Sequence, residues 1–175
     1  VEPLAPMVLQ ENAVVIDALF GAGLARPIER QAGVVLAAVR DLGLPVVAVD
    51  IPSGVQGDSG EVLGIACPAE VTVTFFRKKP GHLIYPGRGL CGRIVVADIG
   101  IPAGVLDTIK PSASENHPTL WRDAVFQTCP AAHKYNRGHV LIAGGAQMTG
   151  AARLAAQGAR RVGAGLVSIV APAAA

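Results

Sequence analysis

The sequence predicts an α/β protein whose core is a parallel sheet. Short runs rich in Val, Ile and Ala alternate with a segment of helical periodicity, which is the order that crossover connections between parallel strands produce. The 21 glycines and 13 prolines have no fixed period, as expected where tight connections are frequent. Hydrophobic residues make up 51% of the 175 positions, which is enough apolar material for one or two compact cores.

The first half of the chain has the clearer pattern. Residues 13–20 are a short apolar run, which predicts a strand buried on both faces of the sheet. Residues 31–42 carry apolar side chains at helical spacing and precede Gly43, a typical helix stop, so they predict a crossover helix. Three further strands are expected, at residues 46–49, 71–75 and 93–96. Because no helix is evident between the last two strands, a hairpin at the sheet edge is the alternative to a parallel pair.

A second, shorter α/β unit is predicted after a linker. From residue 102 to 118 the periodicity disappears, and the sequence becomes polar and proline-bearing. The elements expected beyond it are strands at 138–143 and 166–170 and an alanine-rich helix at 150–162. These patterns divide the chain into residues 1–102, a linker at 103–118, and residues 119–175. The first residue is Val1 and not methionine, which suggests an interior piece of a longer protein.

Composition disfavours several classes of function. A net charge of +2 gives little reason to expect nucleic-acid binding. No apolar run approaches the roughly 20 residues that a membrane-spanning helix requires, because Asp17 and Asp50 interrupt the best candidates. The 3 cysteines form no CxxC pair, and an odd count suits a reducing compartment. We therefore expect a cytoplasmic protein that binds neither nucleic acid nor membrane.

Two aspartates mark the expected ligand site. Asp17 ends the first strand in "DALFGAGLARP", Asp50 ends the second in "VVAVDIPSGV", and glycine-containing turns follow both. In open parallel sheets, ligands bind beyond the carboxyl ends of the strands. A turn or a helix cap explains either aspartate alone. The presence of two makes a shared ligand site an equally good interpretation.

Polar side chains near these aspartates suggest what such a site could bind. Ser53 follows Asp50 closely, and carboxylate and hydroxyl oxygens suit a hard cation or a sugar hydroxyl. An Asx or Ser turn is the alternative. Arg26 could reach a phosphate with its fork of donors, although a solvated surface arginine is the simpler interpretation.

Other motifs do not meet the requirements of the chemistry they suggest. "GAGLAR" has Arg26 where the dinucleotide fingerprint needs a third glycine. "GGAQMTGAARLAA" has Ala151 and Ala152 where a Walker A loop needs Lys and Ser or Thr, although backbone amides at a helix start can still bind an anion. The basic run "FFRKKPGHLIYPGR" is interpreted as a solvated face. His133 and His139 lack the neighbouring acids or cysteines of a zinc site.

Several spaced segments resemble known families. "DALFGAGLARP", "VVAVDIPSGVQGDSGEVLG", "VTVTFFRKKPGHLIYPGR" and "VVADIGIP" together resemble the latter half of NAD(P)H-hydrate epimerases, over residues 12–102. "HKYNRGHVLIAGGAQMTGAARLAAQGARRVGAGLVSIVAP" is similar to the opening of ADP-dependent NAD(P)H-hydrate dehydratases, which have a ribokinase-like fold. This order resembles the bifunctional nicotinamide nucleotide repair family. The resemblance implies a Rossmann-like layered domain with a parallel sheet, followed by the beginning of a ribokinase-like α/β domain.

The resemblance also implies roles for individual residues. Asp17 and Ser53 match positions that bind a potassium ion in the epimerase family, and Ala151 matches a substrate position. The positions that match the site for hydrated NAD(P)H are Gly21, Ala22, Gly23, Leu24, Ala25, Arg26, Pro27 and Asp50. Epimerisation inverts the hydroxyl-bearing C6 of the nicotinamide ring and needs an acid or base, for which we select Asp50.

For a full-length protein, the resemblance implies a second activity and further partners. ADP-dependent dehydration would return S-NAD(P)H hydrate to NAD(P)H, with ADP or ATP and magnesium bound by residues outside this sequence, in a homo-oligomer. The family's Asn-Asn-Gly-Gly-Asp-Gly loop and late Gly-Thr-Gly-Asp motif are missing here, so we expect this stretch to be inactive alone. The alternative functions are a ribokinase-like small-molecule kinase and a non-catalytic nucleotide-binding module.

Overall fold

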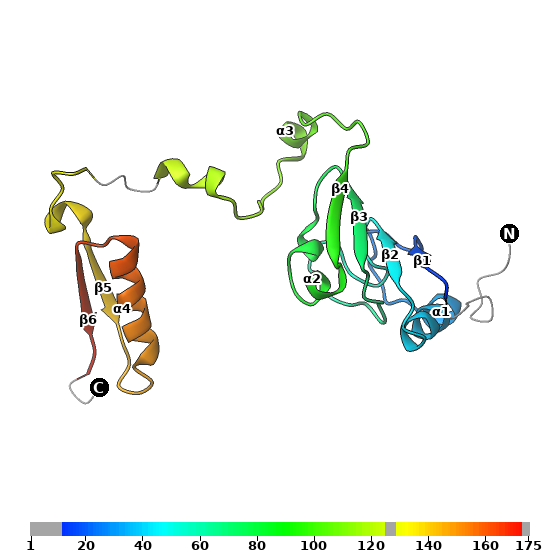
Figure 1. Cartoon of the computed structure of the whole chain (residues 1–175), viewed down its shortest axis with the longest axis horizontal. Coiled ribbons are helices and arrows are strands. Elements are labelled where there is room, and N and C mark those ends of the chain that lie inside the picture. Colours follow the sequence, from blue (N-terminus) through cyan, green and yellow to red (C-terminus); the bar gives the residue numbers. More distant parts are fainter. Residues whose placement is uncertain (1–11, 125–128, 173–175) are drawn as a thin grey trace. The chain divides into compact units, whose positions relative to one another are not determined.

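The computed structural model describes residues 12–124 and 129–172. The chain divides into two compact units between Glu115 and Asn116, and each unit is described by itself. Figure 1 shows both units with their elements labelled. The point of division lies inside the segment 103–118 in which the sequence predicts a linker.

A four-stranded sheet organises the first unit. Its strands are β1 (Val15–Asp17), β2 (Val46–Val49), β3 (Val71–Phe75) and β4 (Arg93–Ala97), in the spatial order β1-β2-β3-β4. Every neighbouring pair is parallel. The predicted α/β fold class with a parallel sheet is therefore confirmed, and β2, β3 and β4 begin at the residues that the sequence indicates.

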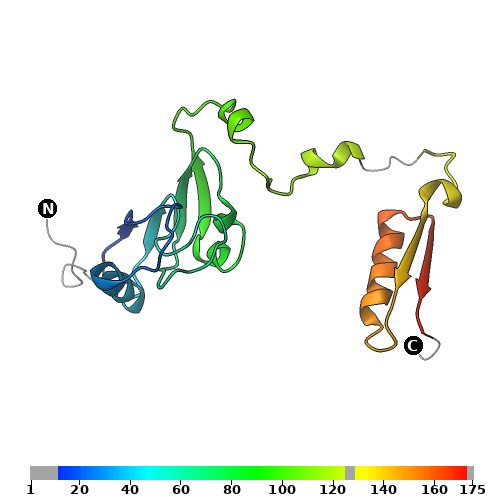
Figure 2. The ribbon, with the colours of Figure 1, turned by 180° about the vertical axis from the view of Figure 1, so that it is seen from behind.

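The hairpin alternative for the last two strands is wrong. β3 and β4 pair in parallel, with Val71 opposite Arg93. Between them the chain returns through a 3₁₀ turn, Pro80–His82, and a short helix α2, Gly87–Leu90. A parallel pair needs such a crossover, and these elements are too short to show a helical period in the sequence. In both views α2 lies beside β4 (Figures 1 and 2).

One helix packs against the sheet in the larger core cluster of the first unit. α1 (Arg30–Asp41) connects β1 to β2 and lies next to these strands in both views (Figures 1 and 2). Gly43, with a φ of 61°, lies just beyond its C-terminus, where left-handed backbone favours glycine. The buried side chains of α1 belong to one core cluster with those of β2, which includes Val35, Leu36, Val39, Val46 and Ala48.

The first strand is shorter and more exposed than predicted. Residues 13–20 were expected to form a strand buried on both faces, but β1 has three residues and Ile16 is 71% exposed. Side chains alternate between the two faces of a strand, so the neighbouring Asp17 points inward and is only 2% exposed. Among the described strands β1 is at the edge of the sheet, and after Asp17 the chain leaves the ladder.

The second unit contains one β-α-β element. It consists of β5 (His139–Ala143), α4 (Gly150–Val162) and β6 (Leu166–Val170), and β5 pairs with β6 in parallel. Gly163, with a φ of 113°, caps the C-terminus of α4, as its position in the sequence predicts. One such element is common to many α/β folds, so it does not by itself define a ribokinase-like fold.

A short helix lies within the predicted linker. α3 spans Val105–Ile109, although the sequence indicates no regular structure there. Five residues make less than two helical turns, which is too short for an apolar period to be detected.

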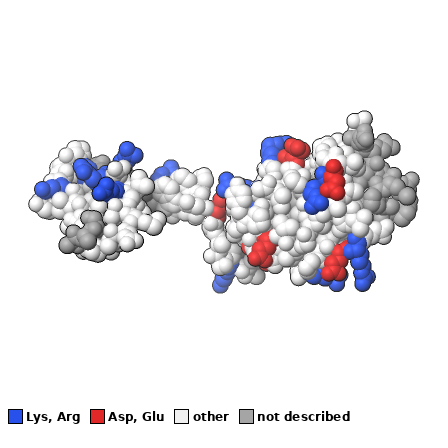
Figure 3. Space-filling view, turned by 90° about the horizontal axis from the view of Figure 1, so that it is seen from below, with Lys and Arg blue, Asp and Glu red and all other residues white. Residues whose placement is uncertain are grey.

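Among residues 12–124 and 129–172, no helix has both the length and the apolar character needed to cross a membrane. In Figure 3, basic and acidic side chains are interspersed over the first unit.

Candidate functional site

Polar side chains gather where three neighbouring strands end. Asp17 is the last residue of β1, Asp50 directly follows β2, and Thr74 is the penultimate residue of β3. In the register of the sheet Asp17 lies opposite Ala48, two residues before Asp50. Because all three strands are parallel, their carboxyl ends share one edge of the sheet, which is the usual place for a ligand in such folds.

Asp17 and Ser53 form a buried hydrogen-bonded pair. Their exposed fractions are 2% and 0%. The Ser53 amide donates to Oδ2 of Asp17 at 2.8 Å, and the Ser53 hydroxyl donates to Oδ1 at 2.5 Å. The Phe20 amide in turn donates to the Ser53 hydroxyl oxygen at 3.0 Å. These bonds tie the loop that follows β1 to the loop that follows β2.

The oxygen atoms of this pair fit a hard cation such as potassium. A hydroxyl has one proton and two lone pairs, so Ser53 retains one lone pair after donating to Asp17 and accepting from Phe20. The Phe20 carbonyl oxygen lies 3.4 Å from the same hydroxyl. Carboxylate, hydroxyl and carbonyl oxygens are the ligands that hard cations prefer. Among the described residues, no cluster of three or more His, Cys, Asp and Glu side chains could hold a metal ion.

The Asp50 carboxylate has three donors around it, one of which is a lysine. The Ala22 amide donates to Oδ2 at 3.0 Å, and the Thr74 hydroxyl donates to Oδ1 at 3.0 Å. The Lys79 ammonium lies 2.6 Å from Oδ1 and also donates to the Thr74 hydroxyl at 2.9 Å. The Asp50 and Lys79 side chains are 22% and 29% exposed, so this ion pair is partly shielded but still reaches solvent.

This environment keeps Asp50 ionised. Burial alone would raise the pKa of the Asp50 carboxyl, but the hydrogen bond and charge of Lys79 and the donors from Ala22 and Thr74 lower it below its ordinary value. The residue also has a φ of 70°, in the left-handed region that side-chain-bearing residues seldom adopt. Unusual backbone of this kind is frequent at functional sites.

A buried histidine completes the group. His82 is fully buried, and burial is the main reason why the pKa of its imidazole is lowered. Its Nδ1 accepts a hydrogen bond from the Lys79 amide at 2.8 Å, and its Nε2 lies 2.8 Å from the Asp50 carbonyl oxygen. The ring therefore contacts the main chains of both members of the ion pair.

The sequence prediction of a solvated face was wrong for part of the basic run. Arg77, Lys78 and Arg88 are exposed, but Lys79 turns toward Asp50 and His82 is buried. Neither Lys79 nor Thr74 was predicted to belong to the site. Lys79 lies four residues beyond the end of β3, and Lys78 is at least as close to that end, so position in the sequence did not single it out.

The glycine loop after β1 lies against Asp50. A Cβ added at Gly21 would lie 3.0 Å from Oδ2 of Asp50, so this glycine allows close approach. The next residue, Ala22, provides the amide that binds the carboxylate. Gly23 and Ala25 are exposed. Ala151, the remaining residue of the predicted substrate site, is exposed at the start of α4 in the second unit.

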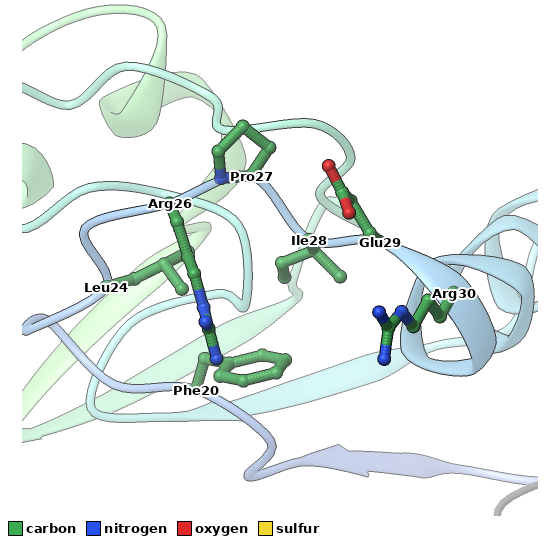
Figure 4. Close-up of a pocket in the computed structure, with 7 residues that line it drawn as sticks. All are labelled: Phe20, Leu24, Arg26, Pro27, Ile28, Glu29 and Arg30. Atoms are coloured by element: carbon green, nitrogen blue, oxygen red, sulfur yellow. The ribbon is translucent and has the colours of Figure 1, made fainter.

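The end of this loop lines a pocket of about 280 Å³ (Figure 4). Its lining consists of Phe20, Leu24, Arg26, Pro27, Ile28, Glu29 and Arg30. Figure 4 shows the Arg26 side chain directed toward the Phe20 ring, whereas Glu29 points away from both. Three of the predicted substrate-binding residues, Leu24, Arg26 and Pro27, thus line the same pocket as Arg30 and Phe20.

The fold and the site together define the first unit as an α/β domain with its polar site at the carboxyl end of a parallel sheet. Residues 2–81 match the family described as "YjeF-related protein N-terminus". This part of the chain is therefore similar to that family, which is the class that the sequence resemblance indicates.

Relatives that match more of the chain have more specific names. A "Bifunctional NAD(P)H-hydrate repair enzyme Nnr" from Coxiella burnetii is 37% identical over 172 residues, which cover 95% of this chain and 34% of that protein. One of the same name from Thermofilum pendens is 40% identical over 153 residues, covering 87% of this chain and 28% of that protein. An "NAD(P)H-hydrate epimerase" from Limosilactobacillus fermentum is 43% identical over 93 residues, covering 53% of this chain and 45% of that protein.

These similarities confirm the resemblance to NAD(P)H-hydrate repair enzymes. The match to the bifunctional proteins extends over both units, because it covers 95% of the chain in one case. The chain spans only about a third of the length of these bifunctional relatives, 34% and 28% in the two cases above.

Proposed function

We propose that this chain is part of an enzyme that repairs hydrated NAD(P)H, and that its first unit contributes acid and base groups for epimerisation at C6 of the nicotinamide ring. The observation that carries the proposal is the ionised Asp50, held against Lys79 at the open end of the sheet. The names of the relatives support this function over the ribokinase-like kinase and over a non-catalytic module.

The ion pair is suited to moving a proton in both directions. Inversion at C6 requires the hydroxyl or the ring bond to leave and return on the other face, and we develop the route in which the oxygen leaves. In our proposal Lys79 protonates the departing oxygen, which leaves as water, and Asp50 removes a proton from the water that adds to the opposite face. The proton then passes from Asp50 to Lys79 across their 2.6 Å contact, which restores both groups.

The neighbouring residues would bind the substrate and the cation. The glycine loop, residues 21–27, brings the Ala22 amide beside Asp50, and Arg26 in the adjoining pocket is suited to a phosphate of the dinucleotide. Asp17 and Ser53 would hold potassium with the Phe20 carbonyl. When bound, the cation would supply positive charge that fixes the two loops and their ligand oxygens.

For the full-length protein we further propose dehydration of S-NAD(P)H hydrate, with ADP or ATP and magnesium as partners. The support is the extent of the similarity, since the match to the bifunctional relatives includes the second unit. On this proposal the second unit is the start of a ribokinase-like domain, in which Ala151 contacts substrate.

The direct test of epimerisation uses the full-length protein and purified R-NADPH hydrate in potassium buffer. Chromatography separates the two epimers over time, and we expect R to convert to S faster than in a blank without protein. ADP is left out, so that dehydration does not consume the product. A conversion rate equal to that of the blank would contradict the proposed epimerisation, and phosphorylation of a hydroxymethyl substrate with ATP would support the kinase instead.

A further inference from the structure

The His82 ring connects its own turn to the loop after β2, where its contact residue Asp50 lies 32 residues earlier in the sequence. Its Nδ1 accepts the Lys79 amide proton at 2.8 Å, so in the neutral ring the proton must be on Nε2. Nε2 then donates to the Asp50 carbonyl oxygen at 2.8 Å. Both hydrogen bonds go to main-chain atoms, and the side chains of Asp50 and Lys79 remain free to pair with each other.

The turn that carries Lys79 is also packed tightly on the loop after β2. The Gly81 amide donates to the Gly57 carbonyl at 2.6 Å. A Cβ at Gly81 would lie 2.4 Å from the Gln56 carbonyl oxygen, so this contact leaves no room for a side chain. Packing therefore holds the turn against the loop. The two hydrogen bonds of the His82 ring then orient the main chains of Lys79 and Asp50 relative to each other.

We propose that His82 is a positioning residue, whose two ring nitrogens hold the main chains of Asp50 and Lys79 so that their side chains meet. The inference rests on the proposed function in so far as this pair carries out the acid and base steps. His82 acts through the two residues and needs no contact with substrate. Asp50 has a left-handed φ of 70°, which is a strained backbone conformation. The hydrogen bond from Nε2 of His82 to the Asp50 carbonyl helps to hold that conformation.

Two conservative variants separate the two connections. In His82→Asn the side-chain oxygen can take the place of Nδ1 and keep the Lys79 bond, but the side chain is too short to reach the Asp50 carbonyl. In His82→Gln the side-chain amide can take the place of Nε2 and keep the Asp50 bond, while the Lys79 bond is lost. His117, which is exposed, provides the matched control as His117→Gln.

We expect both His82 variants of the full-length protein to lose kcat, by up to about 100-fold, while KM for R-NADPH hydrate changes much less. A displaced acid and base slow the chemical step without removing the groups that bind the substrate. His117→Gln should match the wild type. A role in folding alone predicts a lower melting temperature with unchanged kcat per active molecule, and that result would overturn the proposal.

A second measurement is independent of catalysis. In full-length protein with ¹⁵N-labelled histidine, two-bond ¹H–¹⁵N spectra distinguish the two neutral tautomers and the imidazolium, and the His82 signal is the one missing from His82→Gln. We expect the Nε2-protonated neutral form at pH 7. In protein with ¹⁵N-labelled lysine, we expect slow exchange of the Lys79 amide that becomes fast in His82→Gln but not in His82→Asn. If the wild type does not epimerise the substrate but these signals are as expected, the proposed function fails and the positioning geometry stands. An Nδ1-protonated or charged ring would overturn the positioning proposal itself.

Discussion

A single methyl group at Gly57 should disturb the acid and base site without touching any charged residue. A Cβ at this position would lie 2.5 Å from the Ala22 carbonyl oxygen and 2.7 Å from the Ala22 Cβ. Ordinary contact begins at 3.4 Å, so Gly57→Ala must move Ala22 by nearly 1 Å, or move its own loop by as much. Ala22 donates to the Asp50 carboxylate, and a misplacement of roughly 1 Å can cost up to about 100-fold in rate.

The assay for Gly57→Ala is epimerisation of R-NADPH hydrate by the full-length protein, together with the melting temperature. We expect kcat to fall by about one to two orders of magnitude. The free energy of unfolding should fall by about 1–3 kcal/mol, as is typical of overpacking. The matched control is Gly158→Ala in α4, where an added Cβ has no neighbour within 4 Å. A Gly57→Ala enzyme with the kcat of the wild type would refute the idea that the close packing of these loops positions Asp50.

Two further changes test the charged groups. Lys79→Met removes the proposed acid, so kcat/KM should fall, and it also removes the cation that lowers the pKa of Asp50 against the effect of burial, so the acid limb of the remaining profile should move to higher pH; the exposed Lys78→Met should change neither. Because the folded-state pKa of Asp50 is lowered, the wild type should be more stable than Lys79→Met above the ordinary carboxyl pKa of 3.8, and the difference should vanish as pH falls through the folded-state value. Asp17→Ala removes the only carboxylate of the Asp17–Ser53 pair, so replacing choline with potassium at constant ionic strength should no longer raise the melting temperature; a potassium-dependent shift that persists would contradict the cation assignment.

Most of the fold could be predicted because its strands and helices have local signatures. Residues 46–49 and 71–75 are rich in β-branched side chains, and residues 150–162 are followed by a glycine, so both their type and their limits were evident. The edge position of β1 could not be predicted, since exposure of Ile16 depends on which neighbours cover it and not on its own segment. A hairpin was left open beside the parallel pairing of β3 with β4, because the crossover consists of short turns.

The site was only partly predictable for a related reason. Asp17 and Asp50 stand at strand ends, where a general rule for parallel sheets places ligands, and the structure brings Asp17 together with Ser53. Lys79 lies in a run of exposed basic residues, and nothing local distinguishes it from Lys78. Its partner is 29 residues away, so the ion pair is a product of the tertiary fold.

The central claim is that Asp50 is the base of epimerisation, and Asp50→Asn in the full-length protein tests it most directly. Asparagine keeps the size of the side chain and removes the proton-accepting charge, so binding of the hydrate should remain measurable while turnover of the R epimer falls by about 10²–10⁴-fold. Asp58→Asn, at an exposed aspartate in the same loop region, is the matched control and should keep the wild-type rate. If chromatography shows that Asp50→Asn converts the R epimer within about threefold of the wild-type rate, far less than the loss expected for a general base, Asp50 is not the catalytic base.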